Sequence, residues 1–280
     1  MTPICNFDTQ HEQTMNKLTN LPFKEKVNEL NENLIAFAEP ETVFCEKQSW
    51  LKNHFLPMMS IDLGEFKTEW SGTIVHLINP IEPYEYYIGG CTPAYHNEFI
   101  GENWLAFRLT DDNKYEFLGE EGYFTRSPQY RENLKQILCA DFDPNAFENK
   151  DILEKRKEDF YQEALKYFDE SVQIYQENKS DFEKREGLYG DEPYDNTYFG
   201  LYLDRLGGVI KGGNWVDTSP IPPAFTLKED KDWNVFIEHQ GNPFYHIASS
   251  SGYKYSNGAD DVILLYEPVS RIALFTFEWT

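Results

Sequence analysis

Val262-Ile-Leu-Leu-Tyr266 and Arg271-Ile-Ala-Leu-Phe-Thr-Phe277 are the two stretches of sequence that decide the fold. Both are nearly continuous apolar runs, and the short segment Glu267-Pro-Val-Ser270 separates them. Runs of this kind are typical of strands that are buried on both faces, whereas half-exposed strands alternate polar and apolar residues. The sequence over 262–277 therefore predicts a β-hairpin whose strands lie at the centre of a sheet.

Other runs rich in β-branched and aromatic residues predict further strands. They lie at 73–78, 84–88, 104–110 and 115–118 in a first β-region, and at 235–237 and 245–248 in a second. The polar turn Asp111-Asp-Asn-Lys114 joins two of these runs, which indicates another hairpin.

Helical spacing of apolar residues occurs on both sides of the first β-region. The N-terminal stretch to about residue 55 carries Val27, Leu30, Leu34, Ile35 and Phe37 at roughly helical spacing, then Trp50, Leu51 and Phe55. Residues 144–187 form the longest periodic segment, with an apolar stripe from Leu153 to Tyr175. This segment predicts one long amphipathic helix, or two helices broken near Asn149 or Asn178, which must lie across the body or protrude from it.

These patterns together predict an α+β fold with mostly antiparallel β-regions, N-terminal helices and a long inserted amphipathic helix. A chain of 280 residues is long enough for one large domain or two smaller ones. We expect a single α+β domain over 1–280, with a possible subdivision into 1–125, a helical insert 126–188 and a β part 189–280.

The charge balance limits the classes of partner. Lys and Arg total 25 against 48 Asp and Glu, for a net charge of -23. Because 16% of the residues are aromatic, the chain can nevertheless build a hydrophobic core, which a disordered acidic tail cannot. The surface of such a folded protein is strongly negative, so it repels nucleic acid and anionic membranes and attracts basic partners. We therefore expect a basic protein partner, no nucleic acid and no membrane.

The compartment is predicted from the start of the chain and from its cysteines. The first 17 residues show neither a basic region nor an apolar core of a secretory signal. The four cysteines Cys5, Cys45, Cys91 and Cys139 are far apart and form no CxxC motif, which favours free thiols over disulfides. We expect a cytoplasmic protein.

Catalytic and metal-binding motifs do not emerge from the sequence. It contains no GxSxG, HExxH, P-loop or GxGxxG motif. The segment Asp141-Phe-Asp-Pro-Asn145 begins like a calcium loop, but Ala146 and Ile152 replace the required Gly and Glu, so an Asp-rich helix cap is the better interpretation. We expect no catalytic residue, no metal and no cofactor.

Two loops are candidates for function. Asp191, Glu192, Tyr194 and Asp195 combine carboxylates with a tyrosine, as a partner-binding patch for basic residues does, although a solvated loop has the same composition. The glycine-rich segment 207–215 either makes tight turns or brings the backbone close to a ligand. In the second case Lys211, Trp215, His239 and His246 would line a pocket.

Residues 198–280 resemble a YwqG-type domain, a family of bacterial proteins some of which occur beside polymorphic toxins. The resemblance rests on Leu206-Gly-Gly208 followed by Trp215 and Pro220, on the strand around 235–237, and on Gly258-Ala-Asp-Asp-Val-Ile-Leu-Leu-Tyr266. The segment Glu238-His-Gln240 only approximates the Gln that the family carries there. The resemblance implies a β-rich bacterial protein with an immunity role and assigns no catalytic residues.

The predicted function is therefore an immunity protein that binds a cognate toxin effector of interbacterial competition, such as one delivered by type VI secretion, and occludes its active site or substrate surface. The alternative is a small-molecule-binding protein or enzyme with its pocket near 207–215. A third option is an adaptor that oligomerises through the long helix, and the sequence leaves the oligomeric state open.

Overall fold

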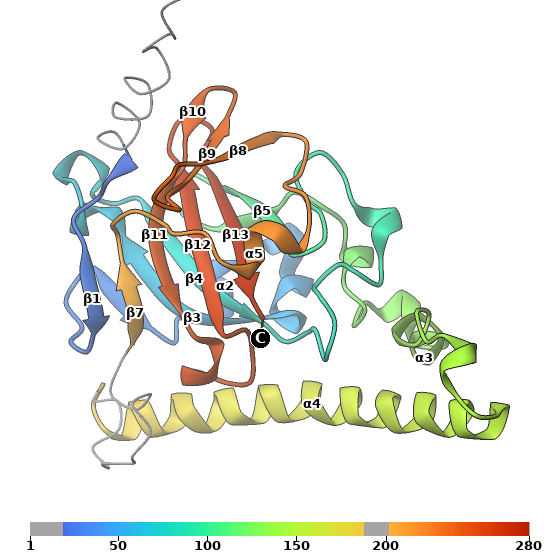
Figure 1. The fold of residues 1–280 in the computed structure, drawn as a ribbon. Coiled ribbons are helices and arrows are strands. Elements are labelled where there is room, and N and C mark those ends of the chain that lie inside the picture. Colours follow the sequence, from blue (N-terminus) through green and yellow to red (C-terminus); the bar gives the residue numbers. More distant parts are fainter. Residues whose placement is uncertain (1–18, 188–201, 280) are drawn as a thin grey trace, which may run out of the picture.

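A seven-stranded antiparallel sheet forms the centre of the molecule (Figure 1). The computed structural model describes residues 19–187 and 202–279. The strand order is β1-β7-β11-β12-β13-β5-β6. The bounds are β1 Lys24–Val27, β7 Leu203–Leu206, β11 Tyr245–Ser250, β12 Asp261–Glu267, β13 Ile272–Glu278, β5 Trp104–Leu109 and β6 Tyr115–Phe117.

The predicted hairpin is confirmed at the middle of this sheet. β12 pairs antiparallel with β13 from Asp261↔Glu278 to Glu267↔Ile272. Alternate side chains enter two different hydrophobic clusters, because Leu264 and Phe275 belong to one and Leu265 and Leu274 to the other. Both faces of the hairpin are covered, which explains its continuous apolar sequence.

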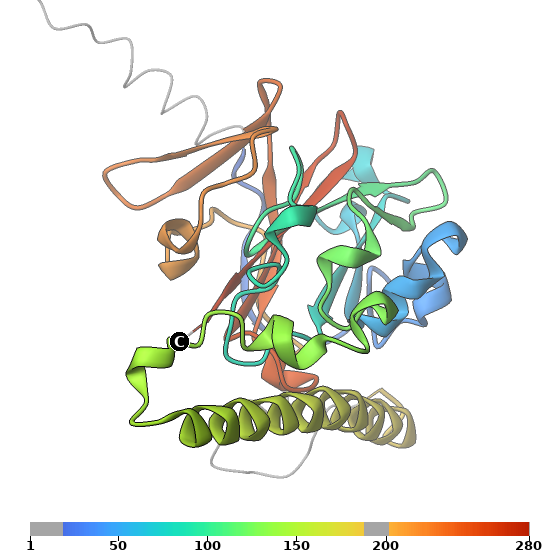
Figure 2. The same cartoon turned by 90° about the vertical axis from the view of Figure 1, so that its right-hand side faces the viewer.

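Two three-stranded sheets supply those covers on opposite faces (Figure 2). The sheet β2-β3-β4, with β2 Leu34–Ala36, β3 Phe55–Asp62 and β4 Ile74–Pro80, contributes to the larger cluster. The sheet β10-β9-β8, with β8 Phe225–Glu229, β9 Val235–His239 and β10 Asn242–Pro243, contributes to the smaller one together with Trp215 of helix α5 (Asn214–Thr218). The result is a layered α+β fold, so the predicted fold class is confirmed.

The long helix is a single element, α4 (Lys150–Lys184), that runs across the ends of the strands (Figures 1 and 2). Asn149 caps its N-terminus by accepting a hydrogen bond of 3.0 Å from the amide of Ile152. The buried stripe of Phe160, Ala164, Phe168 and Tyr175 joins the larger hydrophobic cluster. Of the alternatives that the sequence leaves open, the structure has the single amphipathic helix lying across the body, with no break at Asn178.

The helix predicted from the spacing of apolar residues between Val27 and Phe37 is wrong. These residues form β1 and β2, which pair antiparallel with β7 and β3, as in Val27↔Leu203 and Leu34↔Ile61. Lys26 and Phe37 have positive φ angles, which an α-helix cannot accommodate. Pairing with distant strands thus outweighs the local helical spacing. Only short helices follow, α2 (Pro40–Val43) and the 3-10 helix η1 (Glu46–Asn53), so the second predicted helix exists as η1.

Residues 84–88 form no strand, against the prediction. Their backbone is irregular, it follows a cis peptide bond between Glu82 and Pro83, and Glu85 has a φ of 51°. Strand β3 begins at Phe55, where the sequence predicted the end of a short helix, and it is buried along nearly its whole length. Its Pro57 lies at a shift in the register with β4, where a missing amide donor is tolerated.

Short helices complete the described part of the chain. They are α3 (Leu134–Leu138) and the 3-10 helices η2 (Leu63–Glu65), η3 (Thr68–Trp70), η4 (Pro93–Tyr95), η5 (Glu121–Tyr123), η6 (Pro128–Tyr130), η7 (Pro144–Ala146) and η8 (Gly252–Lys254). Asp143 caps η7 through the amide of Asn145, as the cap interpretation predicts. In residues 19–187 and 202–279, no helix has both the length and the apolar character needed to cross a membrane.

The division into 1–125, 126–188 and 189–280 stays a prediction. Residues of all three ranges, such as Phe55, Phe168 and Phe275, nevertheless meet in one hydrophobic cluster. The three described cysteines, Cys45, Cys91 and Cys139, carry free thiols.

Candidate functional site

The predicted partner-binding residues Asp191, Glu192, Tyr194 and Asp195 lie outside the described residues. Their role stays a prediction. The described part of the chain contains two neighbouring cavities, and both are lined by residues at the end of β13.

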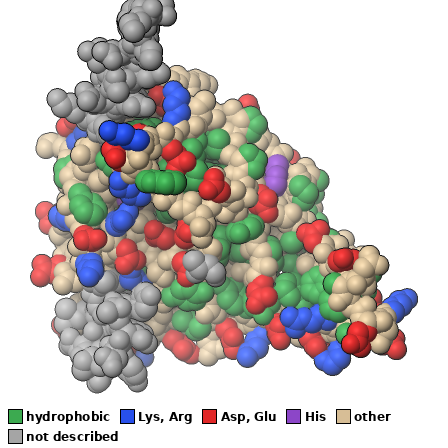
Figure 3. All heavy atoms as spheres, viewed as in Figure 1, with side chains coloured by type: hydrophobic (Ala, Val, Ile, Leu, Met, Phe, Trp, Pro, Cys, Tyr) green, Lys and Arg blue, Asp and Glu red, His purple; other side chains and the backbone are tan. Residues whose placement is uncertain are grey.

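The first cavity has a volume of about 510 Å³ and aromatic walls. We call it the tyrosine cleft, and its rings are Tyr84, Tyr86, Tyr87, Tyr167, Tyr253 and Trp279. Glu85 and Asp260 add two carboxylates, and the described lining contains no Lys or Arg. Figure 3 shows acidic and hydrophobic side chains side by side on the face above α4.

Four separate segments bring these rings together. Tyr84, Tyr86 and Tyr87 come from the irregular segment after β4, Tyr167 from α4, Tyr253 from η8 and Trp279 from the end of β13. The ring of Tyr84 lies 5.4 Å from that of Tyr167, and its hydroxyl donates a hydrogen bond of 3.2 Å to Glu163. The indole of Trp279 donates a hydrogen bond of 2.8 Å to the side-chain oxygen of Asn103. These contacts fix the walls before any ligand binds.

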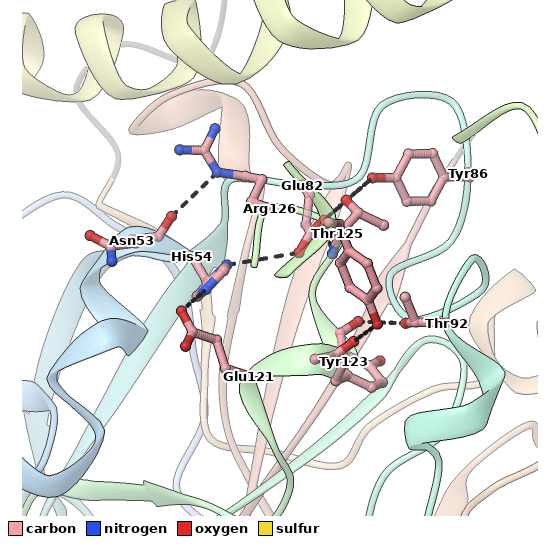
Figure 4. Close-up of polar contacts among 11 residues, drawn as sticks. Asn53, His54, Glu82, Tyr86, Thr92, Glu121, Tyr123, Thr125 and Arg126 are labelled. Carbon is pink, nitrogen blue, oxygen red and sulfur yellow. Dashed lines mark hydrogen bonds and ion pairs between the residues drawn. The ribbon is translucent and has the colours of Figure 1, made fainter. Parts of the chain in front are cut away.

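A buried polar cluster lies behind Tyr86 (Figure 4). Glu82 is 1% exposed, and its Oε2 accepts hydrogen bonds from the amide of Thr125 at 2.9 Å, from the hydroxyl of Thr125 and from the hydroxyl of Tyr86 at 3.3 Å. The other oxygen, Oε1, has no hydrogen-bond partner among the described residues and lies 4.0 Å from Nδ1 of His54. Glu82 thus holds one ring of the cleft in place.

The charge states of this cluster follow from its burial. Burial raises the pKa of Glu82 to about 7, and burial, followed by the positive charge of Arg126, lowers the pKa of His54 to about 3. His54 is 0% exposed, and its Nε2 lies 3.5 Å from Glu121. Two groups with separated pKa values can form an acid–base pair. Neither Glu82 nor His54 is among the described residues that line the tyrosine cleft. The cluster contacts the cleft through the hydrogen bond that holds Tyr86.

The second cavity, of about 430 Å³, lies beside the glycine-rich segment. Lys211, Trp215 and His246 line it, as the pocket hypothesis predicts, together with acidic residues that include Asp261 and Glu278. We call it the glycine-segment cavity, and it shares Asp260 with the tyrosine cleft.

His239 does not line this cavity, against the prediction. It lies on β9 with its Nδ1 3.1 Å from the hydroxyl of Ser270, and it packs against the rings of Phe99 and Phe225. The register of β9 in the smaller sheet carries it to this other environment, and no sequence signal announces that register.

The glycines of the segment act first as turn residues. Gly207 has a φ of +70°, and a Cβ there would lie 2.0 Å from the carbonyl oxygen of Pro22. Glu278 accepts hydrogen bonds from the amides of Asn214 and Trp215 at 3.1 and 3.2 Å. Backbone amides that a phosphate would need are therefore already occupied by a carboxylate, which supports the turn interpretation over a phosphate loop.

Two polar groups of the cavity are nevertheless unusual. Burial raises the pKa of Asp261 to about 7, and its Oδ1 is buried with no hydrogen-bond partner among the described residues. Nε2 of His246 is also buried and without such a partner, while its Nδ1 lies 2.8 Å from the carbonyl oxygen of Gly207. No group of three or more His, Cys, Asp or Glu side chains in the described residues is arranged to hold a metal ion.

Sequence reasoning missed the tyrosine cleft. Pro83-Tyr-Glu-Tyr-Tyr87 combines three rings with a carboxylate, and that composition could have marked it as a binding segment. A comparison of the chain with family models, curated proteins and solved structures finds no match.

Proposed function

We propose that this protein is an immunity protein that binds a basic toxin effector and neutralises it by occluding the toxin's active site or substrate surface. The observation that carries the proposal is the tyrosine cleft, because its described walls are aromatic and acidic and contain no Lys or Arg. Aromatic side chains supply rigid contact area at interfaces, and carboxylates match the Lys and Arg of a basic surface.

The overall charge supports the same partner. A net charge of -23 attracts a positively charged protein at long range and accelerates the encounter. The resemblance of residues 198–280 to YwqG-type domains points to a bacterial toxin as the partner.

The product of the gene adjacent to this one is the partner to test. Co-expression with this protein should restore the growth of cells that the adjacent product kills. The association rate of the two purified proteins should fall about tenfold or more when NaCl rises from 20 to 300 mM, since exposed charges are then screened. An association rate that does not respond to salt, or an adjacent product that this protein does not neutralise, would overturn the proposal.

The predicted loop can be tested in the same assay. A variant with Asp191→Asn, Glu192→Gln and Asp195→Asn removes three charges near Tyr194, and Glu132→Gln at an exposed position is the control. If the loop binds the partner, the triple variant loses more than three times the binding free energy that Glu132→Gln loses, and it retains the far-UV spectrum of the wild type.

The glycine-segment cavity favours a second function, the binding of a small polar molecule. Its walls hold Lys211, Trp215 and the buried polar groups of Asp261 and His246. A thermal-shift screen with nucleotides, sugars and metal salts tests it. A compound that raises the melting temperature by several degrees should lose this effect in Lys211→Ala and keep it in Lys228→Ala, an exposed lysine of β8 outside the cavity.

A further inference from the structure

We infer that the tyrosine cleft is a pocket for a cationic side chain, and that the group it takes is the guanidinium of an arginine. The inference rests on the proposed function in one respect, since the basic partner would supply that arginine. It adds the chemistry by which the partner is recognised and the residues that recognise it.

The walls have the composition that binds organic cations. A cation over the face of a tyrosine or tryptophan is attracted by the ring's quadrupole, by about 0.5–2 kcal/mol for each good contact. The cleft offers several rings, of which Tyr253 is 56% exposed and Tyr87 is 37% exposed, so their surfaces are available to a ligand. A guanidinium suits such a site because it is planar, stacks on rings and is weakly hydrated.

The electrostatics of the cleft favour a cation over an anion. Glu85 and Asp260 line it, and Glu163 accepts the hydroxyl of Tyr84 at its edge. Burial, and then the negative charges of Glu85 and Glu163, raise the pKa of Tyr84, and these outweigh the opposing positive charge of Arg156. An anionic ligand would meet these carboxylates with no described basic residue in the lining to offset them.

The size of the cleft points to an arginine within a peptide segment. A volume of about 510 Å³ falls in the range of about 300–1,000 Å³ that is common for ligand pockets. One side chain does not fill this space, so residues next to the arginine would contact the outer rings Tyr87 and Tyr253. A protruding loop of the partner fits this description.

The probe is a hexa-arginine peptide, and its matched control is a hexa-citrulline peptide, which has the same shape without the charge. Binding is followed by NMR at the indole N–H of Trp279, assigned with Trp279→Phe, because an acidic protein attracts hexa-arginine at many surface sites and this signal reports on the cleft alone. Hexa-arginine should shift the Trp279 signal in a saturable way, and hexa-citrulline should not.

Variants of the cleft test the assignment. Tyr253→Ala and Glu85→Gln change exposed residues of the lining, and each should weaken hexa-arginine binding at the Trp279 signal about fivefold, as expected for the loss of about 1 kcal/mol. The control variants are Trp233→Ala, an exposed ring on the β8–β9 turn, and Glu132→Gln, an exposed carboxylate. Both should change the affinity for hexa-arginine less than twofold.

Three outcomes overturn the inference. They are equal binding of the citrulline peptide, an unshifted Trp279 signal, and cleft variants that behave like the controls. If one of these outcomes occurs but the adjacent gene product still binds with a strong salt dependence, the arginine pocket is wrong and the proposed function is retained. If hexa-arginine binds in the cleft but the adjacent gene product does not bind the protein, the arginine pocket is retained and the proposed function is wrong.

Discussion

Glu82 shows how one buried residue holds a wall of the tyrosine cleft and makes the stability of the fold sensitive to pH. Its ordinary pKa is 4.5, and burial raises it to about 7 in the folded protein. A raised carboxyl pKa means that the folded state holds the proton more tightly than the unfolded state does. The stabilisation is therefore complete below about pH 4.5 and is lost as the pH rises through about 7.

We predict that Glu82→Gln removes this loss. Glutamine keeps an oxygen that accepts from Thr125 and Tyr86 but cannot ionise. The free energy of unfolding of the variant minus that of the wild type should increase by about 2 kcal/mol between pH 5 and pH 8. Urea unfolding at both pH values measures it, with Glu132→Gln as an exposed control that shows no such trend. A difference that stays constant with pH would mean that Glu82 is not protonated on folding.

Gly207 is a second position where a single residue controls stability, because there is no room for a Cβ atom. Its positive φ and the 2.0 Å approach of a Cβ to the carbonyl oxygen of Pro22 predict that Gly207→Ala costs about 2 to 4 kcal/mol, the sum of backbone strain and a clash with backbone. Gly241→Ala is the matched control, because Gly241 also has a positive φ of +80° but nothing lies within 4 Å. The control should cost about 1 kcal/mol in urea unfolding. Equal costs would contradict the close approach.

At the scale of elements, α4 shows which of its faces carries the stability. Phe168 is 2% exposed within the larger hydrophobic cluster, whereas Ile152 on the same helix is 42% exposed. Phe168→Ala should lower the free energy of unfolding by about 3 to 5 kcal/mol, and Ile152→Ala by less than about 1 kcal/mol. Chemical denaturation measures both. Similar small losses would mean that α4 is only loosely attached to the sheets.

The elements that sequence reasoning found are those whose pattern is long and set by local burial. The hairpin β12–β13 and helix α4 belong here, because each repeats one pattern over many residues. β1 and β2 were missed because they are short and their pairing partners lie far along the chain, as in Val27↔Leu203. A chance helical spacing then outweighed the strand signal.

The candidate site could not be predicted for a related reason. The rings of Tyr84, Tyr167, Tyr253 and Trp279 come from segments separated by many residues, and only the tertiary fold brings these segments to one cleft. Sequence reasoning did find the cavity residues Lys211 and Trp215, because they follow the glycines that shape the local turn. Binding residues within one loop are visible in a sequence, whereas a cleft between elements is not.

At the scale of the whole molecule, the excess of acid over base sets the response to salt. Salt screens two opposing effects, the attraction within ion pairs and the repulsion among like charges. Pairs such as Lys155–Asp159 and Lys166–Glu170 are exposed, and exposed pairs contribute about 0–1 kcal/mol each. With 48 acidic residues and 25 basic ones, many carboxylates can have no basic partner, so repulsion should be the larger effect.

We therefore predict that NaCl stabilises the fold at neutral pH. Raising NaCl from 20 to 500 mM should increase the free energy of unfolding by about 1 kcal/mol and the melting temperature by about 2 to 4 °C. The same titration near pH 4.6, the isoelectric point, is the control, since the net charge there is close to zero and the gain should disappear. A melting temperature that falls with NaCl at pH 7 would show that the ion pairs outweigh the repulsion. The surface charge would then be locally compensated, which would also weaken the case for long-range attraction of a basic partner.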